Sequence, residues 1–231
     1  MARLRMIKQS YEIAAITQAV RITLSVMRSY IDSPQKMSMQ SEQKIANTIT
    51  AAFYTHNVMH AYDPIIASNA NAATLHHSPD KTVIQPGSTV LFDVGAEYDG
   101  YAADISRTVH MGTQQEITQL VEAVTAAQHT LIQSIKPGGS WRSLHKLAIQ
   151  ELKIIAQNHR LLKDQAITEL FPHAIGHFLG LDVHDIGDYA QPFQEGMVLT
   201  VEPGLYSKKH GIGVRIEDDV VVTKTGAKII N

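Results

Sequence analysis

Two aspartates, Asp93 and Asp104, flank a segment whose turn is easy to recognise, Asp99-Gly100. Asp-Gly is a strong signal for a two-residue β-hairpin turn. With that turn, position 93 lies opposite position 106, and the two aspartates share one sheet face in diagonal positions. Adjacent carboxylates repel by roughly 4 kcal/mol at 4 Å and an effective dielectric of 20, so they need a counter-cation, a shared proton or solvent. A metal ion is the simplest explanation, and an exposed Asp104 or an ion pair with Arg107 is the alternative.

Three histidines lie close together further along the chain, at positions 173, 177 and 184. The glycines among them disfavour a long helix and allow close approach of the backbone. Imidazoles in such a setting point to metal ligation or acid–base chemistry. Any one of them alone is more often an ordinary core or surface residue, so the argument depends on their clustering.

Further acids lie in the last third of the sequence. Glu202 follows an apolar strand sequence and precedes Pro203-Gly204, so its carboxylate lies where a strand gives way to a turn. In the last predicted strand, Arg215, Glu217 and Asp219 alternate onto one face. Taken alone, this strand is better interpreted as a solvent-exposed, salt-bridged face.

The elements that must position these residues alternate between helices and strands. Apolar residues at helical spacing predict helices over 10–30, 41–56, 113–135 and 140–158, with Ser10 as an N-cap and Thr113 to Glu116 as a capping box. Pro137 to Ser140 should break the chain and cap the last of these helices. Strands are predicted over 88–94, 197–202 and 213–222. Since no repeat or linker is visible, we expect one α+β domain over residues 1–231.

Composition excludes several classes of function. The chain has 231 residues, is 44% hydrophobic and carries 20 basic against 22 acidic side chains. A balanced charge without long runs predicts no nucleic-acid partner and no membrane surface. The chain has no cysteine, which excludes disulfides and zinc thiolates. Without an apolar signal-peptide core or membrane span, a cytoplasmic location is expected.

Together, these segments resemble the pita-bread metallopeptidases, and within them the Xaa-Pro group of aminopeptidase P and prolidase. The spacing of Asp93 and Asp104 matches that family, and so do three segments in order, over 173–185, 201–206 and 213–219. The resemblance covers nearly the whole chain. It implies the creatinase/aminopeptidase fold, in which helices cover a curved, mainly antiparallel sheet.

The same resemblance implies a centre with two divalent cations. Asp93 would bind one metal, His177 and Glu202 the other, and Asp104 and Glu217 would bridge both. Four carboxylates and one imidazole suit manganese best, with cobalt, zinc or iron as alternatives. A pair of metals at about 3.5 to 4 Å would ionise a bridging water near neutral pH and so create the nucleophile.

The implied reaction is hydrolysis of Xaa-Pro bonds, at the N-terminus of peptides or in dipeptides, on substrates with proline at the second position. Glu202 would carry the proton from the water to the leaving nitrogen of proline. His184 would donate to the developing oxyanion, and His76 would line the pocket near the leaving group. His173 would position the substrate, Arg215 would fix a ligating carboxylate, and Tyr206 would border the pocket.

Some features depart from the family pattern and leave alternatives open. The N-terminal domain usual in Xaa-Pro peptidases is not expected here, and Ala174 stands where glycine is common. The short interval from Glu202 to Glu217 resembles compact prolidases, and no arginine lies between His184 and Glu202, where some aminopeptidase P sequences have one. These features do not decide whether the chain resembles a dipeptidase or an aminopeptidase. A homodimer is compatible with the resemblance. A methionine aminopeptidase-like enzyme and a catalytically silent binding module of the same fold are the rival hypotheses.

Overall fold

The computed structural model describes residues 2–231 and contains helices and strands in alternation. The helices are α1 (Ala2–Met6), α2 (Ser10–Ile31), α3 (Glu42–Thr55), α4 (Gln115–Ser134), α5 (Trp141–Asn158) and α6 (Ile167–Leu170), with short 3-10 helices η1 (Pro34–Met37) and η2 (Asn69–Ala73). The strands are β1 (Met59–His60), β2 (Ile65–Ser68), β3 (Thr89–Val94), β4 (Ala96–Tyr98), β5 (Tyr101–Ala102), β6 (Ile105–His110), β7 (Val198–Val201), β8 (Gly204–Ser207), β9 (Ile212–Arg215), β10 (Asp218–Val222) and β11 (Ala227–Ile229). The strands form four small sheets with the orders β1-β4-β5, β2-β3-β6, β7-β10-β11 and β8-β9, and every strand pair in them is antiparallel.

The four long helices predicted from periodicity are present, but two of the predicted start signals are wrong. Gln9, not Ser10, is the N-cap of α2, and its backbone N–H donates to Glu12 at 2.7 Å. The N-cap of α4 is Gln114, so the hydroxyl of Thr113 lies one residue too early to cap the helix. Ser140 caps α5 as expected, because its hydroxyl accepts from the N–H of Ser143.

The first hairpin has the register that its turn predicts. Asp99 and Gly100 have φ angles of 50° and 79°, the left-handed pair that a two-residue I′ turn requires. Tyr98 pairs with Tyr101, and the same register continues to Asp93 opposite Ser106. Strands β3 and β6 therefore place the first acidic pair as the sequence indicated.

The last predicted strand is not continuous. The expected strand over 213–222 is divided into β9 and β10, and its partner is divided into β7 and β8 at Pro203, which has no N–H for the ladder. Gly204 pairs with Arg215 and Val201 with Asp218, so one register runs through the break. The interpretation of 215, 217 and 219 as an exposed face is wrong, because these residues are only 4%, 2% and 0% exposed.

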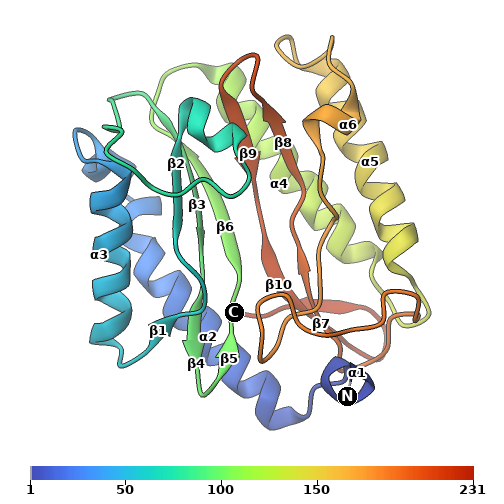
Figure 1. Ribbon diagram of the computed structural model, residues 1–231. Coiled ribbons are helices and arrows are strands. Elements are labelled where there is room, and N and C mark those ends of the chain that lie inside the picture. The colour runs from blue at the N-terminus through green and yellow to red at the C-terminus, as the bar shows by residue number, and fades with distance from the viewer. Residues whose placement is uncertain (1) are drawn as a thin grey trace.

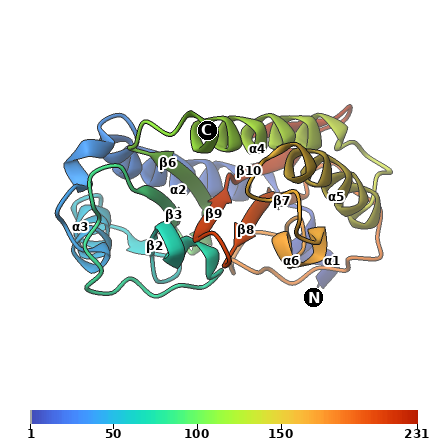
Figure 2. The same cartoon turned by 90° about the horizontal axis from the view of Figure 1, so that it is seen from above.

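Helices cover one side of the strands and leave the other side to loops. Figures 1 and 2 show α2 and α4 behind the strands, with α3 and α5 at the two outer edges. Two large apolar cores result, and a third, small cluster includes Ile65 and Leu91. Phe53 and Phe92 belong to the core under α2 and α3, whereas Leu131 and Leu152 belong to the core under α4 and α5. The site lies where these halves meet.

Across residues 2–231, none of the helices has both the length and the apolar character needed to cross a bilayer.

Candidate functional site

A cavity of about 330 Å³ opens between the hairpin of β3 and β6 and the hairpin of β8 and β9, and nine of the ten site residues predicted from the sequence line it, whereas Tyr206 does not. The nine are His76, Asp93, Asp104, His173, His177, His184, Glu202, Arg215 and Glu217. Asp93 lies on β3, Asp104 just before β6, Glu202 just after β7 and Glu217 between β9 and β10. Three of the acids thus come from points where a strand ends or breaks, whereas Asp93 lies within the ladder of β2, β3 and β6.

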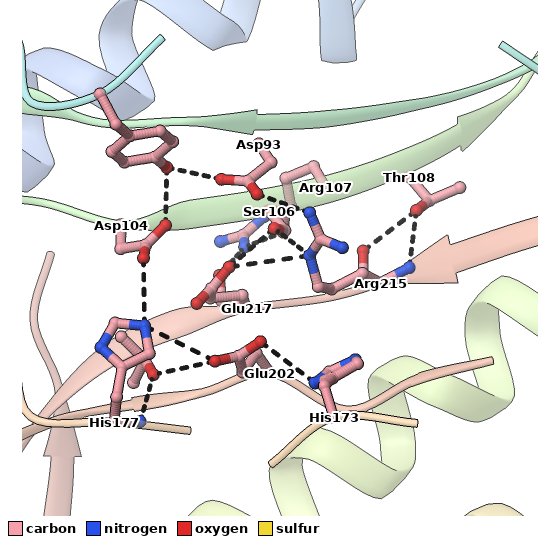
Figure 3. A network of polar contacts seen from close by, with 12 residues as sticks. Asp93, Asp104, Ser106, Arg107, Thr108, His173, His177, Glu202, Arg215 and Glu217 are labelled. Carbon is pink, nitrogen blue, oxygen red and sulfur yellow. Dashed lines mark hydrogen bonds and ion pairs between the residues drawn. The ribbon is translucent and has the colours of Figure 1, made fainter. Parts of the chain in front are cut away.

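The five predicted ligands face one another across this cavity (Figure 3). His177 Nε2 lies 3.4 Å from Asp104 Oδ2 and 3.6 Å from Glu202 Oε1. One ligand atom each from Asp104, His177 and Glu217 lies within 4.8 Å of the other two. At these distances, several of the ligand atoms can reach a common cation.

The backbone determines which nitrogen of His177 faces the cavity. Nδ1 lies 3.1 Å from the carbonyl of Phe178, a contact that needs a proton on Nδ1. The N–H of His177 donates to Thr200 Oγ1 at 3.0 Å, which holds the loop against β7. Nε2 is therefore directed at Asp104 and Glu202, as a metal-ligating imidazole requires.

Arg215 connects the two hairpins. Its guanidinium donates to Asp93 Oδ2 at 2.5 Å, to Ser106 Oγ at 2.8 Å and to the hydroxyl of Tyr206 at 3.0 Å. Ser106 in turn donates to Glu217 Oε2 at 2.7 Å. Arg215 is thus placed to orient Asp93 directly and Glu217 through Ser106. This placement agrees with its expected supporting role.

Two residues of this network escaped sequence analysis as site residues. The Tyr62 hydroxyl lies 2.6 Å from both Asp93 Oδ1 and Asp104 Oδ1, although nothing in its surrounding sequence marks it. Ser106 could have been found, since the hairpin register already placed position 106 opposite Asp93. A phenol donates one proton, so the double contact needs a proton on one carboxyl group as well.

Burial and mutual repulsion shift the pKa values of these acids. Burial raises the pKa of Asp93 to about 6, against the opposing charge of Arg215. Burial also raises the pKa of Glu202 to about 7, against the opposing charge of His177. For Glu217, burial and the charges of Asp104 and Glu202 together hold the pKa well above its usual range. Carboxylates that resist ionisation in this way are poised to exchange protons for a cation.

The histidine and its closest acid are shifted as a pair. Burial acts to lower the pKa of His177, but hydrogen bonding to Asp104 outweighs it and raises the pKa to about 9. For Asp104, burial acts to raise the pKa, and His177 outweighs it and lowers the pKa. In the metal-free protein the imidazolium thus compensates part of the negative charge.

The remaining histidines surround the acids at the cavity wall. His173 Nδ1 lies 2.7 Å from the carbonyl of Ala174 and 3.4 Å from Glu202 Oε2, and Nε2 lies 3.0 Å from the Tyr206 hydroxyl. Burial lowers the pKa of His173 to about 4, so its ring is neutral near pH 7. The ring of His184 packs edge-on against the ring of His177, with 4.2 Å between the ring centroids. Tyr206 contacts the site through His173 and Arg215.

The donor set fits divalent cations. Four carboxylates and one Nε2 atom converge, and their charge is only partly balanced by Arg215 and His177. Oxygen-rich sets with one imidazole suit manganese and similar metals, and a cation would relieve the repulsion that raises the acids' pKa values.

Comparison with known proteins gives relatives of one kind. The chain is 33% identical over 255 residues to the Xaa-Pro aminopeptidase of Haemophilus influenzae, covering 100% of this chain and 58% of that protein. It is also 33% identical over 231 residues to the Xaa-Pro dipeptidase of Pyrococcus horikoshii, covering 97% of this chain and 62% of that protein. The chain therefore spans somewhat more than half the length of these curated relatives.

Solved structures agree with the sequence relatives. Aminopeptidase P from E. coli with the inhibitor Pro-Leu aligns with a TM-score of 0.89 and 29% identity, covering 99% of this chain and 57% of that one. Proline aminopeptidase P II from Yersinia pestis aligns with a TM-score of 0.88 and 30% identity, covering 98% and 57%. The pita-bread fold expected from the sequence is confirmed. Because the model of metallopeptidase family M24 also matches residues 14–224, the chain belongs to that family.

Proposed function

We propose that this chain hydrolyses Xaa-Pro peptide bonds with the help of two divalent metal ions. The observation that carries the proposal is the convergence of four carboxylates and His177 Nε2 on one cavity. Relatives named Xaa-Pro aminopeptidase and Xaa-Pro dipeptidase support the substrate class. A peptide with proline at the second position is the proposed substrate.

Asp93, Asp104, His177, Glu202 and Glu217 would hold the metals. Bound there, two divalent ions would supply a Lewis acid for the carbonyl oxygen and a water that ionises near neutral pH. The manganese preference, a cytoplasmic location and a homodimer stay predictions from the sequence.

Glu202 is the proposed proton carrier. Its side chain is 17% exposed, so water can reach it from the cavity, and a carboxylate can carry a proton between a water and a leaving group. It would take the proton of the attacking water and pass it to the proline nitrogen as the bond breaks. The neutral ring of His173, 3.4 Å away, would help to orient the carboxylate and the substrate.

His184 and His76 would act on the substrate from the cavity wall. His184 would donate to the carbonyl oxygen as negative charge develops there. His76 would hydrogen-bond near the leaving group. Arg215 would touch no substrate, and would act by holding Asp93 and Ser106.

The test is an assay of metal content and turnover on the same preparation. The protein is supplied with manganese, cobalt and zinc in turn and offered an Xaa-Pro dipeptide, a longer Xaa-Pro peptide and a matched peptide with alanine at the second position. We expect two metal ions per chain, preferential cleavage before proline, and loss of turnover in Glu202→Gln by roughly 100-fold or more.

Three outcomes would overturn the proposal in different ways. Two bound metals without hydrolysis would favour the silent binding module. Release of an N-terminal methionine in preference to cleavage before proline would favour a methionine aminopeptidase-like enzyme. Equal cleavage of the proline and alanine peptides would refute the substrate class alone. Comparing the two proline substrates separates dipeptidase from aminopeptidase.

A further inference from the structure

His76 is the cavity residue whose own side chain is least supported. It lies between η2 and β3, in a stretch from 74 to 82 without helix or strand. No hydrogen bond joins its ring to any side chain or backbone group of the described chain, residues 2–231. It also lines a second cavity of about 450 Å³, together with Tyr62 and His77. The ring therefore has empty space beside the catalytic cavity into which it can move.

The next residue in the chain is held firmly. His77 Nε2 lies 2.7 Å from Glu42 Oε2, and the two side chains are 12% and 0% exposed. His77 does not line the catalytic cavity, whereas His76 does. The two neighbours thus have separate surroundings: His76 lies at the cavity, and His77 lies at the start of α3.

Glu42 is a fully buried carboxylate that joins several segments. Its Oε1 accepts from the N–H of Ser68 at 2.6 Å and from the Ser68 hydroxyl at 2.7 Å. Asn71 Nδ2 contacts both carboxylate oxygens at 3.1 Å. Helix α3, strand β2, η2 and the segment of His76 therefore meet at one side chain. Since both oxygens already accept hydrogen bonds from the protein, hydrogen bonding explains the cluster without a metal.

The first turn of α3 also holds the far end of the segment. The N–H of Glu42 donates to Thr82 O at 3.0 Å, and the N–H of Gln43 donates to Asp80 O at 2.9 Å. These are helix N-terminal donors that would otherwise lack partners. The segment is thus attached to α3 at positions 77, 80 and 82, and His77 is the attachment nearest to His76.

We propose that Glu42 and His77 form a clamp that positions His76 at the catalytic cavity, so that both are positioning residues for the reaction. The inference deepens the proposed Xaa-Pro hydrolysis and rests on it for its effect on turnover. Neither residue touches the substrate. Their contribution is to restrict the backbone at 77, and with it the place of the preceding imidazole.

A double-mutant cycle with His76→Ala, His77→Ala and the double variant tests this clamp on an Xaa-Pro peptide. His77→Ala should lower kcat/KM about 10- to 100-fold, the usual effect of losing a supporting partner. In the His76→Ala background the same change should cost less than about 2-fold, because contacts that act through one residue are not additive. Lys81→Ala changes an exposed side chain of the same segment, so it is the matched control and should stay within about 2-fold of the parent.

A purely structural role gives a different result. The losses in kcat/KM would then multiply in the double variant, and that outcome overturns the proposal. So does a Lys81→Ala loss as large as that of His77→Ala, since it would show general sensitivity of the segment. Thermal unfolding of each variant confirms that the comparison is made between folded proteins.

Hydrogen exchange separates failure of the clamp from failure of the proposed function. If the parent protein cleaves no Xaa-Pro peptide, the proposed function fails, and exchange of the hydrogen-bonded amides that hold the segment, those of Glu42, Gln43 and Thr74, still tests the clamp. Exchange of these amides should be at least about 10-fold faster in His77→Ala than in the parent, and unchanged in His76→Ala, because local opening depends on local contacts. Equal exchange in the parent and His77→Ala would refute the clamp.

Discussion

Each of the two hairpins that meet at the cavity brings one pair of acids, but the pairs are compensated differently. Strands β3 and β6 bring Asp93 and Asp104, and the divided strands β7/β8 and β9/β10 bring Glu202 and Glu217. In the first pair, Asp93 contacts Arg215 and Asp104 contacts His177. In the second pair, Glu202 lies 3.6 Å from His177 Nε2, whereas Glu217 is 4.0 Å from Arg215 and accepts from the neutral Ser106. Glu217 is therefore the least compensated of the four acids, and we expect it to depend most on a bound cation.

Residues of each hairpin also contact and stabilise an acid of the other hairpin. Arg215 belongs to the second hairpin and pairs with Asp93 of the first, while Ser106 of the first donates to Glu217 of the second. Asp93 and Glu217 thus each take a partner from the other hairpin. The proposed metal centre would therefore be a property of the interface between two halves, each with its own apolar core.

The largest contrast is expected from neutralising one acid in each hairpin. Asp93→Asn and Glu217→Gln should both lower turnover by at least about 100-fold and reduce metal content, because each removes a proposed ligand. Their effects on the stability of the metal-free protein should differ. Asp93→Asn should cost about 1–3 kcal/mol, because Arg215 loses its charged partner, whereas Glu217→Gln should be neutral or stabilising, because it removes a crowded buried carboxyl.

Denaturant unfolding in the presence of a chelator measures this difference. Equal destabilisation by the two variants would show that the hairpins are compensated alike. Arg160→Ala, which removes only the exposed ion pair with Glu116 at 3.4 Å, serves as a control and should change stability by less than about 1 kcal/mol.

A smaller effect is expected from pH. The pKa values of Asp93, Glu202 and His177 are raised to about 6, 7 and 9, so the folded metal-free protein binds protons that the unfolded chain has already released. Its stability should therefore fall most clearly as pH rises from about 6.5 through 9, because between about 4 and 6.5 the lowered pKa of His173, at about 4, opposes the raised pKa values of Asp93 and Glu202. Manganese should replace these protons and give a larger rise in Tm at pH 8 than at pH 5.5. Scanning calorimetry with and without metal tests this, and an equal rise at both pH values would contradict it.

The smallest effects are expected at the two hairpin turns, which lie away from the acids. Gly100 and Gly211 have φ angles of +79° and +61°, so alanine at either should cost about 1–2 kcal/mol. Gly211→Ala should cost the more of the two, because its Cβ would lie 3.3 Å from the Cβ of Ala70. Gly226→Ala, with no positive φ and its nearest neighbour at 3.7 Å, is the matched control. Thermal unfolding measures the cost, and a loss of bound metal in the turn variants would show that the turns also shape the centre.

Local signals in the sequence determined a large part of this protein. Asp99-Gly100 determined the turn and thereby the register from Tyr98 to Asp93, because a two-residue loop leaves only one pairing. Periodic apolar residues determined the four long helices. The ligand candidates could be named because they lie in short segments whose residue types resemble those of a known family.

Tertiary structure alone decided what surrounds those candidates. The contacts of Asp93 with Tyr62 and Arg215 and of His77 with Glu42 join residues 31, 122 and 35 positions apart. No local pattern specifies such pairs, because they depend on how two separately packed halves meet. The break between β9 and β10 also depends on tertiary structure. The sequence over 213–222 looks like one continuous strand, but its partner strand is interrupted at Pro203, and the break lies opposite that interruption. Periodicity reports which face of a strand is apolar, and only packing decides whether its polar face meets solvent or, as at Arg215 and Glu217, a buried cavity.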